Sequence, residues 1–333
     1  MDWNKGFSAQ YYASFVDPKT WRSTGRLEIT GGSIKRVLTG LRQSADIGFV
    51  RFSEGESWLR IHMVARQGSI SENIPLFTGL SSAPDDDIDG RYITNQVQMY
   101  SVLKPADDVL LQRGYYVAAG ADGARKVRDL LSASPAPVEI DGVSPTLASS
   151  IIAEDGETML SMAEKVLTAI NWRLVIDGEG RIKICPKATE ASAVFDPISN
   201  DMIEPVMKRT YDWYSCPNVF RGLMDGSYAI ARDDDPNSPL STVSRGREIW
   251  KEESSCKLAE GESLPMYVRR RLKEEQQISM VVSYDRRYDP NVGASDIVDL
   301  RYPEQKIVGK FQVTSQSIEL GYGARVSEEV ASI

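Results

Sequence analysis

An acidic stretch near residue 87 has the spacing of a cation-binding loop. Asp85, Asp87, Asp89 and Gly90 occupy positions one, three, five and six of a calcium-loop pattern, and oxygen ligands at alternate positions suit a hard cation. The twelfth position is Gln96, where the pattern needs a bidentate Glu, and the residues after Gly90 alternate like a strand. We therefore predict a solvated acidic turn between strands, with a calcium-binding module as the alternative.

The chain has few residues for nucleophilic or metal chemistry. His62 is its single histidine, so Ser-His, Cys-His and most His-ligated metal sites would all depend on it. Alternation with Ile61 and Met63 predicts that His62 lies on the polar face of a strand, at a surface or an interface. The cysteines match no zinc or redox spacing and indicate reduced thiols; they are Cys185, Cys216 and Cys256. We predict no catalytic residue, no cofactor and no metal.

The strongest basic run is Arg269-Arg270-Arg271, in a segment with helical periodicity. Glu274 and Glu275 follow at i+4 from Arg270 and Arg271, which favours ion pairs on a solvated helix face. The alternative is contact with an acidic neighbour. The run lacks interleaved aromatic residues and the formal net charge is −8, so sequence-specific nucleic-acid binding is disfavoured.

Composition indicates a folded chain of two or three domains. The 333 residues are 41% hydrophobic and 26% charged, which allows a buried core and argues against wholesale disorder. No stretch approaches the roughly 20 apolar residues needed to span a bilayer. No apolar stretch follows the amino terminus, so we predict no secretion signal. The odd, sparse set of cysteines favours assembly in a cytoplasm.

Periodicity divides the chain into three regions. Residues 1–110 are rich in alternating runs such as Leu59–Met63, which predicts a small barrel or sandwich. Residues 111–205 are predicted to form an α/β insert. Its helices are expected at Ala106–Gln112, Ala124–Leu131 and Glu157–Ile170, the last with Asp155 as N-cap, and a hairpin at Trp172–Ile176 and Arg181–Ile184.

Residues 206–333 are again predicted to be mostly β. A helix at Leu264–Gln277, with Ser263 as N-cap, interrupts the strands. The strands are expected at Val219–Leu223, Tyr228–Arg232, Ile278–Tyr284, Ile297–Leu300, Ile307–Val313 and Ser317–Leu320. No short tandem repeat is found, although the two β-regions could be a distant structural duplication.

Three segments, in order, resemble the hub proteins of contractile bacteriophage tails. They are Ile29–Arg36, the Gly156–Leu160 helix start leading into Trp172–Gly178, and the C-terminal run Asp296–Leu300, Val308–Ile318 and Ala324–Val330. The family includes the XkdQ/YqbQ-like group of defective phages and phage-derived bacteriocins. Each motif is structural and diffuse, and the resemblance covers most of the chain.

The resemblance implies a mainly β protein with α+β character, in which two tube-like β-barrel domains flank the small α/β insert. It further implies a structural, non-enzymatic hub, a homotrimer whose pseudo-sixfold ring joins the tail tube to the spike around a central channel. The implied partners are the tail tube or tube-initiator protein, the spike, the tape-measure protein and wedge or LysM-like baseplate proteins. The implied location is the tail of a virion or other contractile injection particle.

Edge-like strands and one helix are the predicted interfaces of such a ring. The strands are Tyr92–Tyr100 and Phe311–Ile318, because an unpaired edge can extend a sheet into a neighbour. The helix is Leu264–Gln277. The individual interface residues are Tyr92, Val97, Tyr100, Arg269, Arg270, Phe311, Val313 and Ile318.

A carbohydrate-binding or cell-wall-degrading tail protein is the rival hypothesis, because 6 tryptophans and 14 tyrosines offer rings for stacking on sugars. Most of the tryptophans stand in apolar or alternating runs, which favours packing in the core. These are Trp58, Trp172, Trp213 and Trp250.

Overall fold

The computed structural model describes residues 1–50, 52, 55–83, 85–89, 92–211, 213–224, 226–254, 256, 263–276 and 280–333, with the backbone alone at 86–89 and 92–94. The chain is mostly β-structure, as the sequence predicts. It divides into two compact units. The first comprises Met1–Met207 and Ser283–Val330, and the second comprises Lys208–Val282 and Ala331–Ile333.

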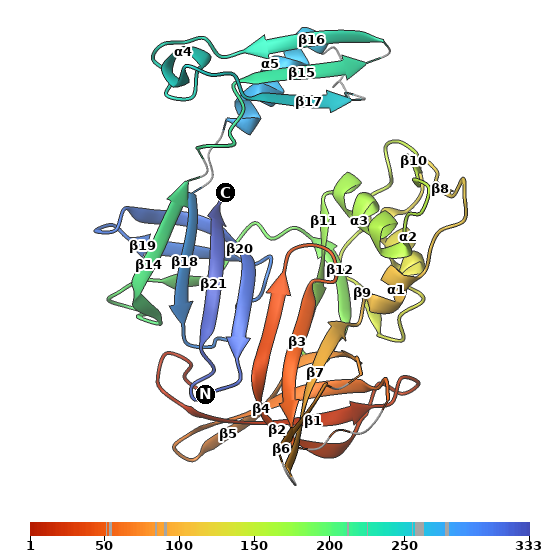
Figure 1. The fold of residues 1–333 in the computed structure, drawn as a ribbon, viewed down its shortest axis with the longest axis vertical. Helices are drawn as coiled ribbons and strands as arrows, with labels where there is room; N and C mark the ends of the chain where they lie inside the picture. Colours follow the sequence, from red (N-terminus) through yellow and green to blue (C-terminus); the bar gives the residue numbers. More distant parts are fainter. Residues whose placement is uncertain are drawn as a thin grey trace. The chain divides into compact units, whose positions relative to one another are not determined.

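The N-terminal strands pair in a closed circuit (Figure 1). They are β1 (Ser8–Val16), β2 (Ser23–Val37), β3 (Gln43–Phe49), β4 (Trp58–Gln67), β5 (Ile70–Ser81), β6 (Asp85–Asp89) and β7 (Tyr92–Ser101). The pairings run from β1 through β4, β5, β7, β3 and β2 and return to β1, while β6 pairs with β7. The alternating apolar side chains point into this circuit, and Ile47, Ile61 and Phe77 are fully buried there.

The C-terminal strands continue the same sheet from β2. They are β13 (Ala191–Phe195), β14 (Ile203–Tyr211), β18 (Met280–Arg286), β19 (Ile297–Tyr302), β20 (Ile307–Glu319) and β21 (Val326–Ser332). The order is β2, β20, β21, β18 and β14, with β19 beside β20 and β13 beside β19. The sequence predicts two strands where β20 is one. Ser315 and Gln316 pair with Val37 and Arg36 of β2, and this ladder carries the strand through the expected break.

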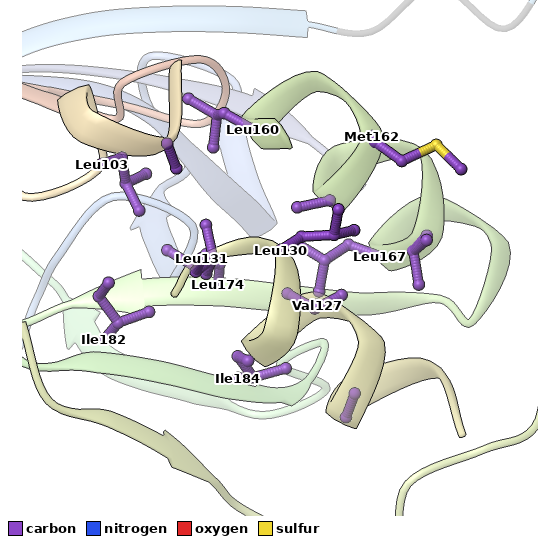
Figure 2. Packing of buried hydrophobic residues seen from close by; sticks show 14 of the residues in the cluster. Leu103, Val127, Leu130, Leu131, Leu160, Met162, Leu167, Leu174, Ile182 and Ile184 are labelled. Carbon is purple, nitrogen blue, oxygen red and sulfur yellow. The ribbon is translucent and has the colours of Figure 1, made fainter. Parts of the chain in front are cut away.

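The insert packs two helices against a small sheet. Its elements are α1 (Lys104–Asp108), β8 (Tyr116–Val117), α2 (Gly123–Leu130), β9 (Val138–Ile140), β10 (Ile151–Ile152), α3 (Met159–Ala169), β11 (Trp172–Ile176) and β12 (Ile182–Pro186). Figure 2 shows Val127, Leu130 and Leu167 of the helices facing Leu174 and Ile184 of the sheet. Burial of this apolar helix face, at about 25 cal/mol per Å², is the main stabilising term of the insert.

Two helix boundaries in the insert differ from the sequence prediction. The first helix spans Lys104–Asp108 and ends before Gln112. The N-cap of α3 is Thr158, whose hydroxyl accepts a hydrogen bond from the Ser161 N–H at 3.1 Å. The expected cap Asp155 lies outside the helix, because the left-handed turn at Gly156 (φ 80°) separates it from the first turn.

The insert contains two structurally matched halves, residues 109–144 and 145–180, although the sequence shows no short tandem repeat. Gly120 and Gly156 have the same left-handed backbone (φ 76° and 80°) at a spacing of 36 residues, from 120 to 156. The N-caps Asp122 and Thr158 follow at the same spacing, and each accepts from the N–H three residues later. The match escapes sequence analysis because most of the paired positions hold different residue types.

Backbone hydrogen bonds between the two halves occur in matching pairs. The Leu111 N–H donates to the Glu157 carbonyl at 2.9 Å, and the Leu147 N–H donates to the Ala121 carbonyl at 2.9 Å. Strands β9 and β11 flank β12, one parallel and the other antiparallel to it. A local twofold axis therefore relates the halves, and each half supplies a strand, an N-capped helix and a second strand.

The second unit is a three-stranded sheet with one helix on it. Its elements are β15 (Val219–Met224), β16 (Ser227–Arg232), α4 (Thr242–Arg245), β17 (Trp250–Ser254) and α5 (Leu264–Glu275). The strand order is β16, β15, β17. Phe220 and Ala231 pack under Val268 and Leu272 of α5. The helix begins near the predicted residue, although Ser263 makes no side-chain cap. Ile278, the first residue of one predicted strand, lies outside the described residues.

Candidate assembly surfaces

The two strands predicted as edges are interior strands of the sheet. Strand β7 pairs with β3, β5 and β6, and β20 pairs with β2, β19 and β21. Their backbone N–H and C=O groups are largely used within the chain, so sheet extension into a neighbour at these strands is not available. Sequence alternation identifies a strand but not its neighbours, which explains the error.

Four of the predicted interface side chains lie in the core of their own chain. Val97, Phe311, Val313 and Ile318 are at most 1% exposed. Tyr100 is half-buried, and its hydroxyl donates to the Gln98 side chain at 3.0 Å. Of Tyr92 the structure describes the backbone, in β7. An interface role for these residues stays a prediction. The four buried side chains could contribute to an interface only indirectly, by holding their strands in position.

The basic run lies on the outer side of α5. Arg269 and Arg270 are exposed, and Arg270 Nη1 donates to Glu274 at 2.9 Å. Arg271 donates to Glu275 at 3.0 Å and to Glu253 of β17 at 3.1 Å. Both predicted i,i+4 pairs are confirmed. Arg271 thus ties the helix to its sheet, while Arg269 and Arg270 remain candidates for contact with another protein.

The face of the second unit's sheet opposite α5 carries exposed apolar side chains. Tyr228 is 69% exposed, Ile230 is 46% exposed and Trp250 is 49% exposed. These residues alternate along their strands with Ala229, Ala231 and Lys251, whose positions face the helix. Arg221 and Glu252 form an ion pair in the middle of the open face. Exposed aromatic and aliphatic side chains gathered on one face are typical of surfaces that contact another protein.

Two of the tryptophans predicted to be core residues are therefore at the surface. Trp172 is 6% exposed and packs in the insert, but Trp213 and Trp250 are 47% and 49% exposed. The alternation around Trp250 is real, yet a three-stranded sheet with one helix can cover only one of its faces. An exposed tryptophan ring can stack on a sugar, and it can equally pack against another protein.

The insert contacts both β-regions of the first unit and fixes their arrangement. Arg42, in the turn after β2, donates to both carboxylate oxygens of Glu164 on α3 at 2.7 and 2.8 Å. On the other side, Arg173 of β11 donates to Asp296 at 2.9 Å and to the Ser295 carbonyl at 2.7 Å. Bidentate and charge-assisted pairs of this kind are geometrically specific. They tie the insert to both β-regions of the first unit.

The residues that the sequence analysis considered for metal binding or catalysis do not form a site within the described part of the chain. Asp85–Asp89 form strand β6 beside β7, so the backbone there is extended and is neither a turn nor a calcium loop. Within the described residues, no three His, Cys, Asp or Glu side chains gather where they could hold a metal ion. The three cysteines are buried and lie outside any disulfide of the described residues.

His62 is buried, contrary to the sequence prediction. It is 8% exposed, it stacks on the cross-strand Tyr12 ring at 4.6 Å between centroids, and its Nε2 lies 3.0 Å from the Ser14 hydroxyl. Burial first, and the nearby Arg60 second, lower its pKa to about 4. His62 is therefore a neutral packing residue at physiological pH. Its alternation pattern could not reveal the neighbouring strand that covers it.

The whole fold is shared with solved phage tail proteins. A 43 kDa tail protein of prophage MuSo2 from Shewanella oneidensis is 12% identical, with a TM-score of 0.67 over 98% of both chains. A tail protein from Neisseria meningitidis is 12% identical, with a TM-score of 0.63 over 98% of this chain and 96% of that one. No protein-family model and no curated protein sequence matches the chain.

A third similar structure belongs to a secretion machine. The Escherichia coli c3393 protein is a component of the type VI secretion system, described as similar to the T4 tail proteins gp27 and gp5. It is 8% identical, with a TM-score of 0.53 over 91% of this chain and 73% of that chain. At such identities the likeness establishes a common fold. Among the described helices, none has the length and apolar character to cross a membrane.

Proposed function

We propose that this protein is a structural component of a phage or phage-like contractile tail, at the baseplate hub. The observation that carries the proposal is the near full-length fold match to a prophage tail protein, which includes the insert and the second unit. The residues independently lead away from catalysis: the lone histidine is buried and neutral, and the described acidic residues form no metal cluster. A non-enzymatic scaffold fits both observations.

The closed strand circuit supports a tube-wall role. Six strands that pair back to β1 have no free lateral edge within the circuit, which suits a rigid barrel that keeps its shape under load. We propose this as the first tube-like barrel domain (1–110), with the α/β insert (111–205) and a second barrel domain (206–333). Residues Lys208–Val282, part of the second compact unit, fall within this last range.

Three such chains would form the pseudo-sixfold ring, with two barrels from each chain. Closed cyclic association requires a heterologous interface, in which different surfaces of adjacent copies meet. The ring would join a sixfold tail tube to a threefold spike, with tube, spike, tape-measure and wedge proteins as neighbours. The exposed face around Tyr228 and Trp250 is available for one of these contacts.

Solution mass and imaging test this proposal. We expect light scattering over a concentration series to give about three times the 37.0 kDa chain mass, and electron microscopy to show threefold rings. We also expect the protein in purified particles of its host, at the tail end away from the head. Absence from such particles, together with cell-wall hydrolysis by the purified chain, would support the rival, a cell-wall-binding or degrading tail protein.

A further inference from the structure

The two equivalent halves of the insert present the same surface twice, and the second copy of that surface is covered. Its loop, residues 177–180, lies against the N-terminal strands. The Glu179 carbonyl accepts from Trp21 Nε1 at 2.8 Å and from Arg60 Nη2 at 2.9 Å, and the Gly178 carbonyl accepts from the Thr78 hydroxyl at 2.9 Å. Beside this loop, Glu164 on α3 accepts both hydrogen bonds from Arg42.

The corresponding surface of the first half is open. Ile140-Asp141-Gly142 repeats Ile176-Asp177-Gly178 at a spacing of 36 residues, from 140 to 176. Val143 stands where Glu179 stands in the second half, and it is 94% exposed. A pocket of about 440 Å³ lies beside it, between the loop and α2. Its lining residues include Arg125, Arg128, Ile140 and Ser144.

The charge of this open surface is the reverse of its covered counterpart. Arg128 on α2 corresponds to Glu164 on α3, again 36 residues apart, from 128 to 164. The Glu164 carboxylate receives an arginine, whereas the Arg128 side chain is half exposed and its nearest carboxylate is its neighbour Asp129 at 4.0 Å. Arg125, one turn earlier, pairs with the N-cap Asp122 at 3.2 Å. A protein that covers this surface as the N-terminal strands cover the other should therefore supply carboxylates.

We propose that the pocket beside α2 binds the acidic strand β6 of a second copy of this chain. Strand β6 is Asp-Asp-Asp-Ile-Asp, with Asp85 exposed at its start, so its sequence supplies carboxylates opposite in charge to Arg125 and Arg128. In the chain's other aspartate run, Asp233 accepts from Gln276, and Asp234 accepts from Arg232. Contact between α2 of one copy and β6 of the next is heterologous and can close into a ring.

This proposal rests on the proposed trimer and adds a named contact to it. The test is sedimentation velocity of the full chain and of the charge-reversal variant R125E/R128E over a range of protein and salt concentrations. We expect the variant to raise the apparent dissociation constant at least tenfold, because like charges would then face each other. The variant D85K/D87K should do the same. Association of the wild type should weaken as salt rises.

The deciding variant combines both reversals in one chain, R125E/R128E/D85K/D87K. It should recover self-association, because the four reversed residues again face opposite charges. The matched control is R113E/K187E, which changes the charge equally at two exposed insert positions outside the pocket, and it should associate like wild type. Thermal unfolding verifies the fold of each variant.

The outcomes separate this contact from the trimer. If the wild type forms trimers and R125E/R128E behaves like the control, the contact is wrong and the trimer stands. If either single-surface variant dissociates but the combined variant does not recover, β6 is not the occupant. If the wild type is a monomer at every concentration, both the contact and self-assembly of the trimer are overturned.

Discussion

Arg286 holds the Glu328 carboxylate with two hydrogen bonds inside the sheet of the first unit. Nε donates to Oε2 at 3.0 Å, Nη2 donates to Oε1 at 2.9 Å, and both side chains are at most 1% exposed. The Tyr284 hydroxyl adds a bond at 2.6 Å, and Gln316 donates to the other oxygen. The network therefore joins strands β18, β20 and β21 at one fully buried point.

Glu328→Gln is expected to destabilise the first unit strongly, because it leaves the buried Arg286 charge without a counter-charge. The expected loss in free energy of unfolding is about 3–5 kcal/mol. Urea denaturation of the full chain measures it. The control is Arg301→Gln, which removes an exposed ion pair with Asp299 and should cost about 1 kcal/mol or less. Equal losses in the two variants would contradict a stabilising role for the buried pair.

The same network predicts acid sensitivity. Burial alone would raise the pKa of Glu328, but Arg286 and the hydrogen bonds to Gln316 and Tyr284 hold it below its usual value of 4.5. A carboxyl whose folded pKa is lowered stabilises the fold above its unfolded pKa, and that contribution disappears as the pH falls through the folded pKa. Below pH 4.5 the free energy of unfolding should therefore fall more steeply with decreasing pH for wild type than for Glu328→Gln. Urea denaturation at a series of pH values measures both slopes.

His62 predicts a second pH dependence, at higher pH. Because its folded pKa is about 4, against 6.5 unperturbed, the unfolded chain binds a proton between these values and the folded chain does not. Above pH 6.5 His62 should not reduce the free energy of unfolding. As the pH falls towards 4, the free energy of unfolding should decrease by about 1–3 kcal/mol. His62→Gln, which does not titrate, should be nearly independent of pH between 7.5 and 5. An unchanged slope in this variant would assign the effect to other groups.

Gly178→Ala should weaken the attachment of the insert to the N-terminal strands. A Cβ at this position would lie 1.8 Å from the Pro75 carbonyl oxygen, so the loop would have to move away. The expected loss is about 2–4 kcal/mol of unfolding free energy. The equivalent change in the first half, Gly142→Ala, meets nothing closer than 3.6 Å and should cost about 1 kcal/mol, from its φ of 106°. Similar losses would argue against tight contact at Pro75.

Neighbouring positions on β15 provide a matched test of the second unit. A Cβ on Gly222 would lie 2.7 Å from Val268 Cγ1 and 2.8 Å from Cys256 Sγ, so Gly222→Ala should cost about 1–3 kcal/mol by overpacking under α5. Arg221→Ala, on the open face, should change the stability by about 0.5 kcal/mol or less. Urea unfolding followed by far-ultraviolet circular dichroism measures the loss in both variants. A reversed order would contradict the assignment of the two faces.

The sequence alone determined the local elements. Apolar spacing of 3.6 residues identified α2, α3 and α5, and the Asp177-Gly178 turn between alternating runs identified the β11–β12 hairpin. It also identified the i,i+4 pairs from Arg270 and Arg271. These features depend on residues a few positions apart, so their physical cause is contained in the segment itself.

The tertiary structure decided everything that depends on distant neighbours. Strands β7 and β20 are interior because β3 and β2, far away in sequence, pair with them. His62 is buried because Tyr12 lies across from it, and Trp250 is exposed because α5 covers only the other face of its sheet. The twofold repeat of the insert shows in matched hydrogen bonds more than in matched residues. Alternation fixes which side chains share a face, but only strand pairing and packing decide which face meets solvent.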